Sequence, residues 1–413
     1  MTHKTLQLLA ACAFAFLLCC APSFAQSGAT RPRRVTSPPP AEGDLPSAEE
    51  TAQSETSSTE PNRADAANNN TNSTNATGGT STANAYALLE RKQYEAALKE
   101  ATSIAASDPD NFEAWKIKGF AEFNLNKLAD AALSLERALR LQRAAGKEDA
   151  NTVDALAQVF VRAEKFEEAL PLLVAATSRA GAKADGTMFF YRGLAEYRTG
   201  KKAEAEKSFA ASVKANPKNA FALFYLGRIA YEAEQLDPAI SWLNRATLAD
   251  GRLAEAWTLL TYSYLRRASG LEGARAQGDY LNAVRAGENL FRVKPDESAS
   301  VLYAQALIRA GQLARAASIL ERFAARDAAQ GSTLFLLGSI YSQTKNYPKA
   351  ALALEQATIK TPDDANIYRE LGYVYEVLKQ YKKALAAYEK GSELAPDDAT
   401  LKESIERVRP HAK

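Results

Sequence analysis

Residues 220–246 read AFALFYLGRIAYEAEQLDPAISWLNRA, and this stretch decides the fold. It sets Gly227 twelve residues before Ala239, and Leu243 follows four residues later. Steps of three and four place side chains on one face of an α-helix. Pro238 comes just before the second apolar run, where a helix can begin with proline because the missing N–H costs nothing in a first turn. The stretch therefore predicts two short helices that pack against each other.

The same pattern recurs along the chain at an almost fixed period. Nine units carry a small residue at the place of Gly227, which we call the small position: Ala85, Gly119, Ala157, Gly193, Gly227, Thr261, Ala304, Gly338 and Gly372. Their position numbers differ successively by 34, 38, 36, 34, 34, 43, 34 and 34. An alanine, which we call the repeat alanine, lies twelve residues later in eight units, and Ala283 is its equivalent after a ten-residue insertion. Such a period predicts two-helix units that stack on their neighbours, because no pair can bury its apolar face alone.

These units resemble the tetratricopeptide repeat, whose signature is W-x2-L-G-x2-Y, then A-x3-F, then proline, with a period of about 34 residues. The resemblance covers residues 84–413 and implies an all-α fold, a right-handed superhelical solenoid of helix-turn-helix repeats. We expect about nine repeats in residues 84–397 and a capping helix and tail in 398–413. The glycines at small positions are expected to let neighbouring helices approach closely: Gly119, Gly193, Gly227, Gly338 and Gly372.

Residues 1–83 differ in composition from the repeats. Lys4 precedes an apolar run, and Ser23 and Ala25 suit a signal-peptidase site, which predicts a signal peptide over residues 1–25. A lipid anchor is the weaker alternative, since the apolar run continues for several residues beyond Cys12. Residues 26–83 are rich in Ser, Thr, Asn and Pro and contain no aromatic residue, which predicts a disordered linker. We therefore expect an exported protein, periplasmic or secreted, that is not transmembrane after cleavage.

The composition excludes several kinds of catalytic and metal site. All three cysteines lie within the first twenty residues, and the two histidines are His3 and His411. Once the signal peptide is removed, the chain has no thiol and a single histidine near its end, so it cannot assemble thiol, Cys/His zinc or Ser-His-Asp sites. Lys and Arg total 51 against 49 Asp and Glu, which leaves no strong field for nucleic acid. We expect no enzyme activity, no cofactor and no metal.

The resemblance also implies where partners bind. In the family, segments of partner proteins lie in a concave groove lined by the first helix of each repeat, at positions three before, one after and four after the small position. Here these positions supply an aromatic strip: Phe190, Tyr197, Phe224, Tyr231 and Tyr262. Arg198, Arg228 and Arg266 lie beside it and are expected to bind partner carboxylates. The alternative is that these aromatic residues pack between helices and the groove binds nothing.

The remaining features left other functions open. The insertion at residues 266–279 contains three glycines but no phosphate-binding motif, so we expect a surface loop at a helix turn. The sequence thus predicts a non-enzymatic scaffold whose partners are other proteins or peptides. The alternatives are a glycan- or cell-wall-binding module that uses the same aromatic groove, and catalysis by carboxylates alone.

Overall fold

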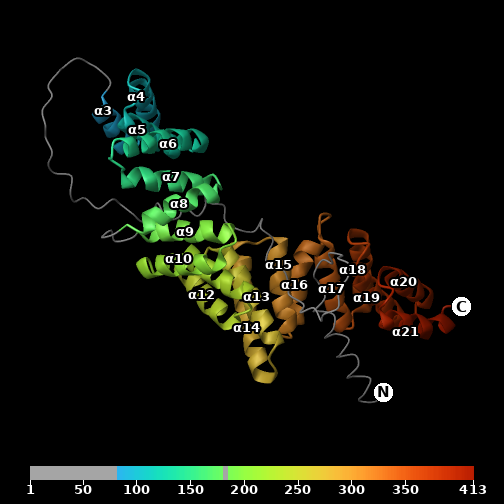
Figure 1. The fold of residues 1–413 in the computed structure, drawn as a ribbon. Coiled ribbons are helices and arrows are strands. Elements are labelled where there is room, and N and C mark those ends of the chain that lie inside the picture. The colour runs from blue at the N-terminus through green and yellow to red at the C-terminus, as the bar shows by residue number, and fades with distance from the viewer. Residues whose placement is uncertain (1–80, 180–184) are drawn as a thin grey trace. The chain divides into compact units, whose positions relative to one another are not determined.

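The computed structural model describes residues 81–179 and 185–413, and the regular elements in these ranges are all helical. The predicted signal peptide and residues 26–80 of the predicted linker lie outside the described residues. The described chain divides after Gly251 into two units. The first unit contains α3 (Thr82–Glu90), α4 (Tyr94–Ser107), α5 (Phe112–Asn124), α6 (Leu128–Ala144), α7 (Ala150–Arg162), α8 (Phe166–Thr177), α9 (Gly186–Arg198), α10 (Lys202–Ala215), α11 (Ala220–Glu232) and α12 (Leu236–Ala249) (Figure 1).

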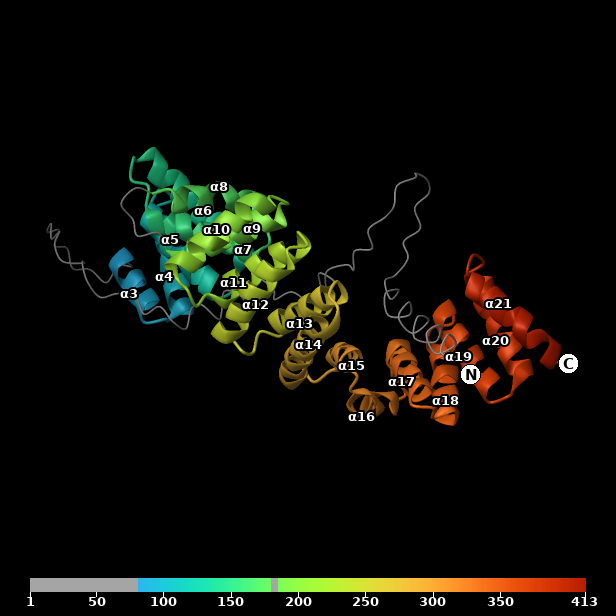
Figure 2. The same cartoon turned by 90° about the horizontal axis from the view of Figure 1, so that it is seen from below.

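The second unit has the same construction. It contains α13 (Ala254–Ser269), α14 (Gly273–Val293), α15 (Glu297–Arg309), α16 (Leu313–Ala324), α17 (Gly331–Gln343), α18 (Tyr347–Lys360), α19 (Ala365–Val377), α20 (Tyr381–Leu394) and α21 (Ala399–Val408), followed by the 3-10 turn η2 (Arg409–His411). Within each unit, each helix packs on the next one along the chain (Figure 2). The chain is therefore an all-α array of helical repeats, as the period predicts.

Most repeats begin and turn by the same local chemistry. Asn or Asp stands directly before many of the first helices, and its side chain accepts a hydrogen bond from a backbone N–H of the opening turn, as Asn219 does from Ala222 at 2.9 Å. In eight of the nine repeats the first helix is followed by a left-handed residue seven positions after the small position, for example Glu234 (φ 62°) and Gly311 (φ 76°). This residue reverses the chain so that the second helix runs back along the first.

The core of each repeat lies between its two helices. A Cβ atom added to Gly227 would lie 2.6 Å from Leu243 Cγ, and one added to Gly193 would lie 2.8 Å from the ring of Phe209. Both distances are too short for carbon atoms, so only glycine allows the observed approach. The side chain four residues after the repeat alanine fills this contact and is fully buried in several repeats: Leu135, Leu173, Phe209, Leu243, Leu320 and Leu354.

The insertion at residues 266–279 is helical, which corrects the expected surface loop. It lengthens two neighbouring helices, so that α13 has 16 residues and α14 has 21, and only residues 270–272 connect them. Arg267 of α13 and Asp279 of α14 form a bidentate ion pair, with both N–O distances at 2.7 Å, and Asp279 is buried. The pair holds the two extensions together, because a guanidinium and a carboxylate match in geometry as well as in charge.

Candidate functional site

The predicted binding residues lie on three first helices. Helix α9 carries Phe190, Tyr197 and Arg198, and α11 carries Phe224, Arg228 and Tyr231. Both helices belong to the first unit, and the site described below is built from them and from other helices of the same unit. Tyr262 and Arg266 lie on α13 in the second unit, where both side chains are half-buried.

Three of the predicted aromatic residues are core residues in this structure. Phe190, Phe224 and Tyr231 expose 0%, 2% and 3% of their surface. The ring of Phe190 lies 5.9 Å from that of Phe209 and 6.3 Å from that of Tyr225, centroid to centroid, and Phe209 and Tyr225 stack at 4.9 Å. Phe190 therefore packs between helices and does not face a groove, which corrects the position expected from the repeat pattern. The structure favours the packing interpretation for this residue.

Tyr197 and Arg228 meet in a polar network that joins α9 to α11. The Tyr197 hydroxyl donates to Glu232 Oε1 at 2.5 Å, and Arg228 Nε donates to the same oxygen at 3.0 Å. Lys202 Nζ lies 2.6 Å from Glu232 Oε2, which places two cations on one carboxylate. The Arg228 guanidinium also lies over the Tyr197 ring, 5.3 Å from its centroid. Arg228 is thus engaged within the protein, because its charge is shared with Glu232.

The network changes the titration of its members. Burial and the hydrogen bond to Glu232 raise the pKa of Tyr197 well above its usual value, since both favour the neutral phenol. Burial alone would raise the pKa of Glu232, but the hydrogen bonds from Lys202, Tyr197 and Arg228 outweigh it and lower that pKa below 4.5. Tyr197 is therefore a neutral donor and Glu232 a carboxylate at neutral pH. The network carries a net positive charge of one from its two cations and one anion.

Arg198 differs from Arg228 in having no acidic partner among the described residues. It is the last residue of α9 and lies over the Phe166 ring at 5.6 Å, and its Nε is buried without a hydrogen-bond partner in the described chain. Arg162 ends α7 in the same way: its guanidinium lies 4.3 Å from the centroid of Phe123, and its Nε also lacks a partner there. No ion pair of either arginine is found among the described residues.

These two arginines occupy the same place in successive repeats, five residues after the small position. The same position is Arg266 and Arg309 in the second unit, where burial lowers the pKa of Arg309. Sequence reasoning named Arg198 and Arg266 at this position because they lie beside the aromatic strip, but it did not follow the position through the other repeats and so missed Arg162 and Arg309. The signal was a repeated arginine at the C-terminal end of first helices, where a cation is also stabilised by the helix dipole. It missed Lys202 and Glu232 because nothing in the period relates them to Tyr197.

Neither a metal cluster nor a membrane-spanning helix occurs in residues 81–179 and 185–413. Within these ranges no group of three or more His, Cys, Asp or Glu side chains is placed to hold a metal ion. Among the same residues, the helices are all too short or too polar to cross a membrane. The buried acid Glu196 accepts from Ser208 Oγ at 2.6 Å and from Arg192 Nε at 2.8 Å, which makes it a structural hydrogen-bond acceptor.

Comparison with solved structures finds several repeat proteins of low identity. A tetratricopeptide repeat protein from Parabacteroides merdae is 16% identical, with 63% of this chain and 98% of that chain covered at a TM-score of 0.41. YrrB, described as a tetratricopeptide repeat protein with an unusual peptide-binding site, is 16% identical, with 49% and 99% covered at 0.41. The Cut9–Hcn1 hetero-tetramer is 13% identical, with 80% and 89% covered at 0.38. These likenesses identify no partner and no site.

A comparison with curated proteins finds no match. The comparison with family models identifies the family. The family model described as tetratricopeptide repeat matches residues 82–148, 155–220, 192–252 and 335–399, and the model described as anaphase-promoting complex, cyclosome, subunit 3 matches residues 276–357. The first model alone matches more than half of the chain, and its matches fall on the helix pairs described above. The chain therefore belongs to the tetratricopeptide repeat family.

Proposed function

We propose that this protein is a non-enzymatic scaffold that binds segments of partner proteins, and that Arg162 and Arg198 bind carboxylates of those segments. The family and the protein-binding character of its repeats support the general statement. A single observation carries the proposal that Arg162 and Arg198 bind carboxylates: their guanidinium groups are half-buried and have no acidic partner in the described chain. A buried or half-buried charge without a counter-ion is costly, and a partner carboxylate would remove that cost.

The surroundings of the two arginines suit binding to a carboxylate. Phe123 and Phe166 lie against the guanidinium groups, and such stacking orients the groups while the terminal nitrogens can still donate. A planar guanidinium presents paired donors that match the two oxygens of a carboxylate. The network of Tyr197, Arg228, Lys202 and Glu232 adds one further net positive charge on α9, α10 and α11. The proposed partner is thus a peptide segment with acidic side chains or a free C-terminal carboxylate.

The test is a peptide array probed with the full chain. Each peptide is printed twice, once with Asp and Glu and once with Asn and Gln at the same places. We expect acidic peptides to be retained and their amide counterparts to be lost, and we expect retention to weaken as salt rises. Equal retention of both members of each pair would contradict the proposal. If the chain bound a glycan array and not the peptide array, the alternative of a cell-wall-binding module would be favoured.

The proposed location is outside the cytoplasm, in the periplasm or the medium. Its support is the N-terminal sequence: Lys4, the apolar run that follows, and the small residues Ser23 and Ala25. Cell fractionation of a bacterial host, with N-terminal sequencing of the product, tests it. We expect a chain that begins at Gln26 in the periplasm or medium. A cytoplasmic chain that retains residues 1–25 would contradict this location.

A further inference from the structure

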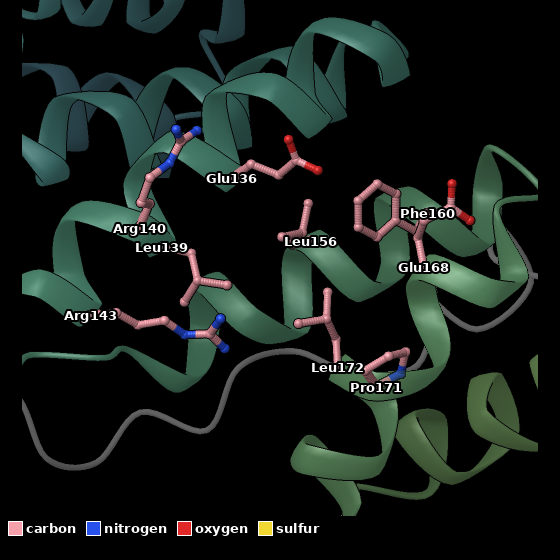
Figure 3. Close-up of a pocket in the computed structure, with 9 residues that line it drawn as sticks. All are labelled: Glu136, Leu139, Arg140, Arg143, Leu156, Phe160, Glu168, Pro171 and Leu172. Atoms are coloured by element: carbon pink, nitrogen blue, oxygen red, sulfur yellow. The ribbon is translucent and has the colours of Figure 1, made fainter.

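A pocket of about 330 Å³ lies in the first unit between α6, α7 and α8, away from the residues used above (Figure 3). Leu139, Leu156 and Phe160 are buried side chains that line it, and Leu172 of α8 adds a further apolar wall. Exposed acidic side chains, Glu136 of α6 and Glu168 of α8, also line it. The volume is at the small end of the range for ligand sites and suits one large side chain.

Comparison with other repeats shows what is missing at this pocket. In the eighth and ninth repeats a tyrosine three residues after the small position donates its hydroxyl to a glutamate five residues after the preceding repeat alanine. These bonds run from Tyr341 to Glu321 at 2.5 Å and from Tyr375 to Glu355. Phe160 and Glu136 occupy the same two positions at the pocket. Because phenylalanine has no hydroxyl, the donor that two other repeats supply to this glutamate is absent here.

Two acidic and two basic side chains line the pocket, and they differ in whether they are paired. In the described chain, no hydrogen bond or ion pair is found for Glu136 or Glu168. Arg143 also lines the pocket, but its Nε is 2.7 Å from Glu148 Oε2, so its charge is already matched. Arg140 is exposed, and Figure 3 shows its guanidinium turned away from the Phe160 ring. The figure also shows the carboxylates of Glu136 and Glu168 on the side of the pocket where Phe160 lies.

We propose that this pocket binds the side chain of an arginine from a partner protein segment. The guanidinium would lie against the Phe160 ring and donate to Glu136 and Glu168, and the methylene groups would lie along the leucines. This chain uses the same contact elsewhere: the Arg326 guanidinium lies 4.6 Å from the centroid of the Phe323 ring. The proposal stands on observations independent of those for Arg162 and Arg198 as binding residues.

The experiment uses the full chain and two fluorescein-labelled peptides with blocked ends. One is Ala-Leu-Arg-Leu-Ala, and the other has citrulline in place of arginine, which keeps the shape and removes the charge. Fluorescence anisotropy should show binding of the arginine peptide and at least tenfold weaker binding of the citrulline peptide. Equal affinities, or no binding of the arginine peptide at millimolar protein, would overturn the proposal.

Variants of the chain complete the test. Glu136→Gln should weaken binding of the arginine peptide at least tenfold, whereas the matched control Glu204→Gln, an exposed acid on α10, should leave it unchanged. Phe160→Tyr should also weaken it tenfold, because the new hydroxyl donates to Glu136 as Tyr341 does to Glu321. Its melting temperature should not fall, which separates occupation of the site from misfolding. Full binding by Phe160→Tyr or by Glu136→Gln would overturn the proposal.

The double variant Arg162→Ala, Arg198→Ala should bind this peptide normally, which distinguishes this site from the proposed carboxylate-binding one.

Discussion

At the scale of single residues, the glycines of the first helices set the distance between paired helices. The atoms that block a Cβ at Gly119, Gly227 and Gly338 belong to the leucine sixteen residues later, in the second helix of the same repeat. A larger residue there would therefore strain its own repeat. At Gly227 this strain falls between α11 and α12.

Gly227→Ala should lower the free energy of unfolding by about 1–3 kcal/mol, because a Cβ would meet Leu243 Cγ at 2.6 Å. Equilibrium unfolding in urea measures the change. Gly278→Ala is the matched control, since nothing lies within 4 Å of its added Cβ and it lies inside α14. That change should raise stability by about 0.5–1 kcal/mol through helix propensity. An unchanged midpoint for Gly227→Ala would contradict the packing described here.

Glu232→Gln tests the network of Tyr197, Arg228 and Lys202 through pH. The pKa of Glu232 lies below its usual value of 4.5 in the folded protein, so ionisation of this group stabilises the fold above pH 4.5 and that contribution is lost as the pH falls. The variant should be less stable than the wild type at pH 7, and the difference should shrink as the pH falls below 4.5. Unfolding curves across this range measure it. A constant difference between Glu232→Gln and the wild type across this range would rule out the assigned role.

At the scale of elements, the lengthened pair α13 and α14 shows what periodicity can and cannot predict. The enlarged interval between Thr261 and Ala304 revealed an insertion, but not its structure. Three glycines argued for a loop, yet Gly273 begins α14 and Gly278 lies in a helix with no neighbour to clash with. The ion pair that joins the extensions links residues twelve apart in a helical hairpin. No local pattern reveals such a pair before the hairpin is known.

Asp279→Asn should loosen the lengthened hairpin without unfolding the unit. The amide cannot replace the bidentate ion pair to Arg267, so the amides of residues 273–280 should exchange with solvent faster. Hydrogen exchange followed by mass spectrometry measures this, and peptides from α17 to α20 serve as internal controls. Unchanged exchange at residues 273–280 would show that the pair does not hold the extension.

At the scale of the whole molecule, the period predicted the helical repeats because it encodes a contact made nine times. The candidate site was harder to predict, because burial depends on what neighbouring helices cover. Phe190 and Tyr197 stand on one face of α9 by their spacing, yet one is fully buried and the other only half-buried. The sequence shows that residues 162 and 198 are arginines. It does not show whether either has an acidic partner, because that depends on side chains distant in sequence.

Leu401→Ala tests whether each repeat is stabilised only by its contacts with neighbouring repeats. Leu401 is fully buried where α21 packs on α20, so the change should cost about 2–5 kcal/mol. In an array where each repeat contacts only its neighbours, exchange should rise first in α20 and α21, while residues 81–179 keep their protection. Hydrogen exchange of the full chain resolves the two regions. A uniform loss of protection over both units would contradict stacking of this kind.

The central claim is that Arg162 and Arg198, at the ends of two first helices, bind partner carboxylates, and one measurement tests it most directly. Affinity for an acidic peptide selected on the array is measured by anisotropy for the wild type, for the double variant Arg162→Ala, Arg198→Ala, and for Arg245→Ala. Arg245 is the matched control because it lies 4.6 Å from the Trp242 ring centroid but on a second helix, α12. We predict at least a tenfold loss for the double variant and none for the control. Equal affinities for all three proteins would contradict the claim.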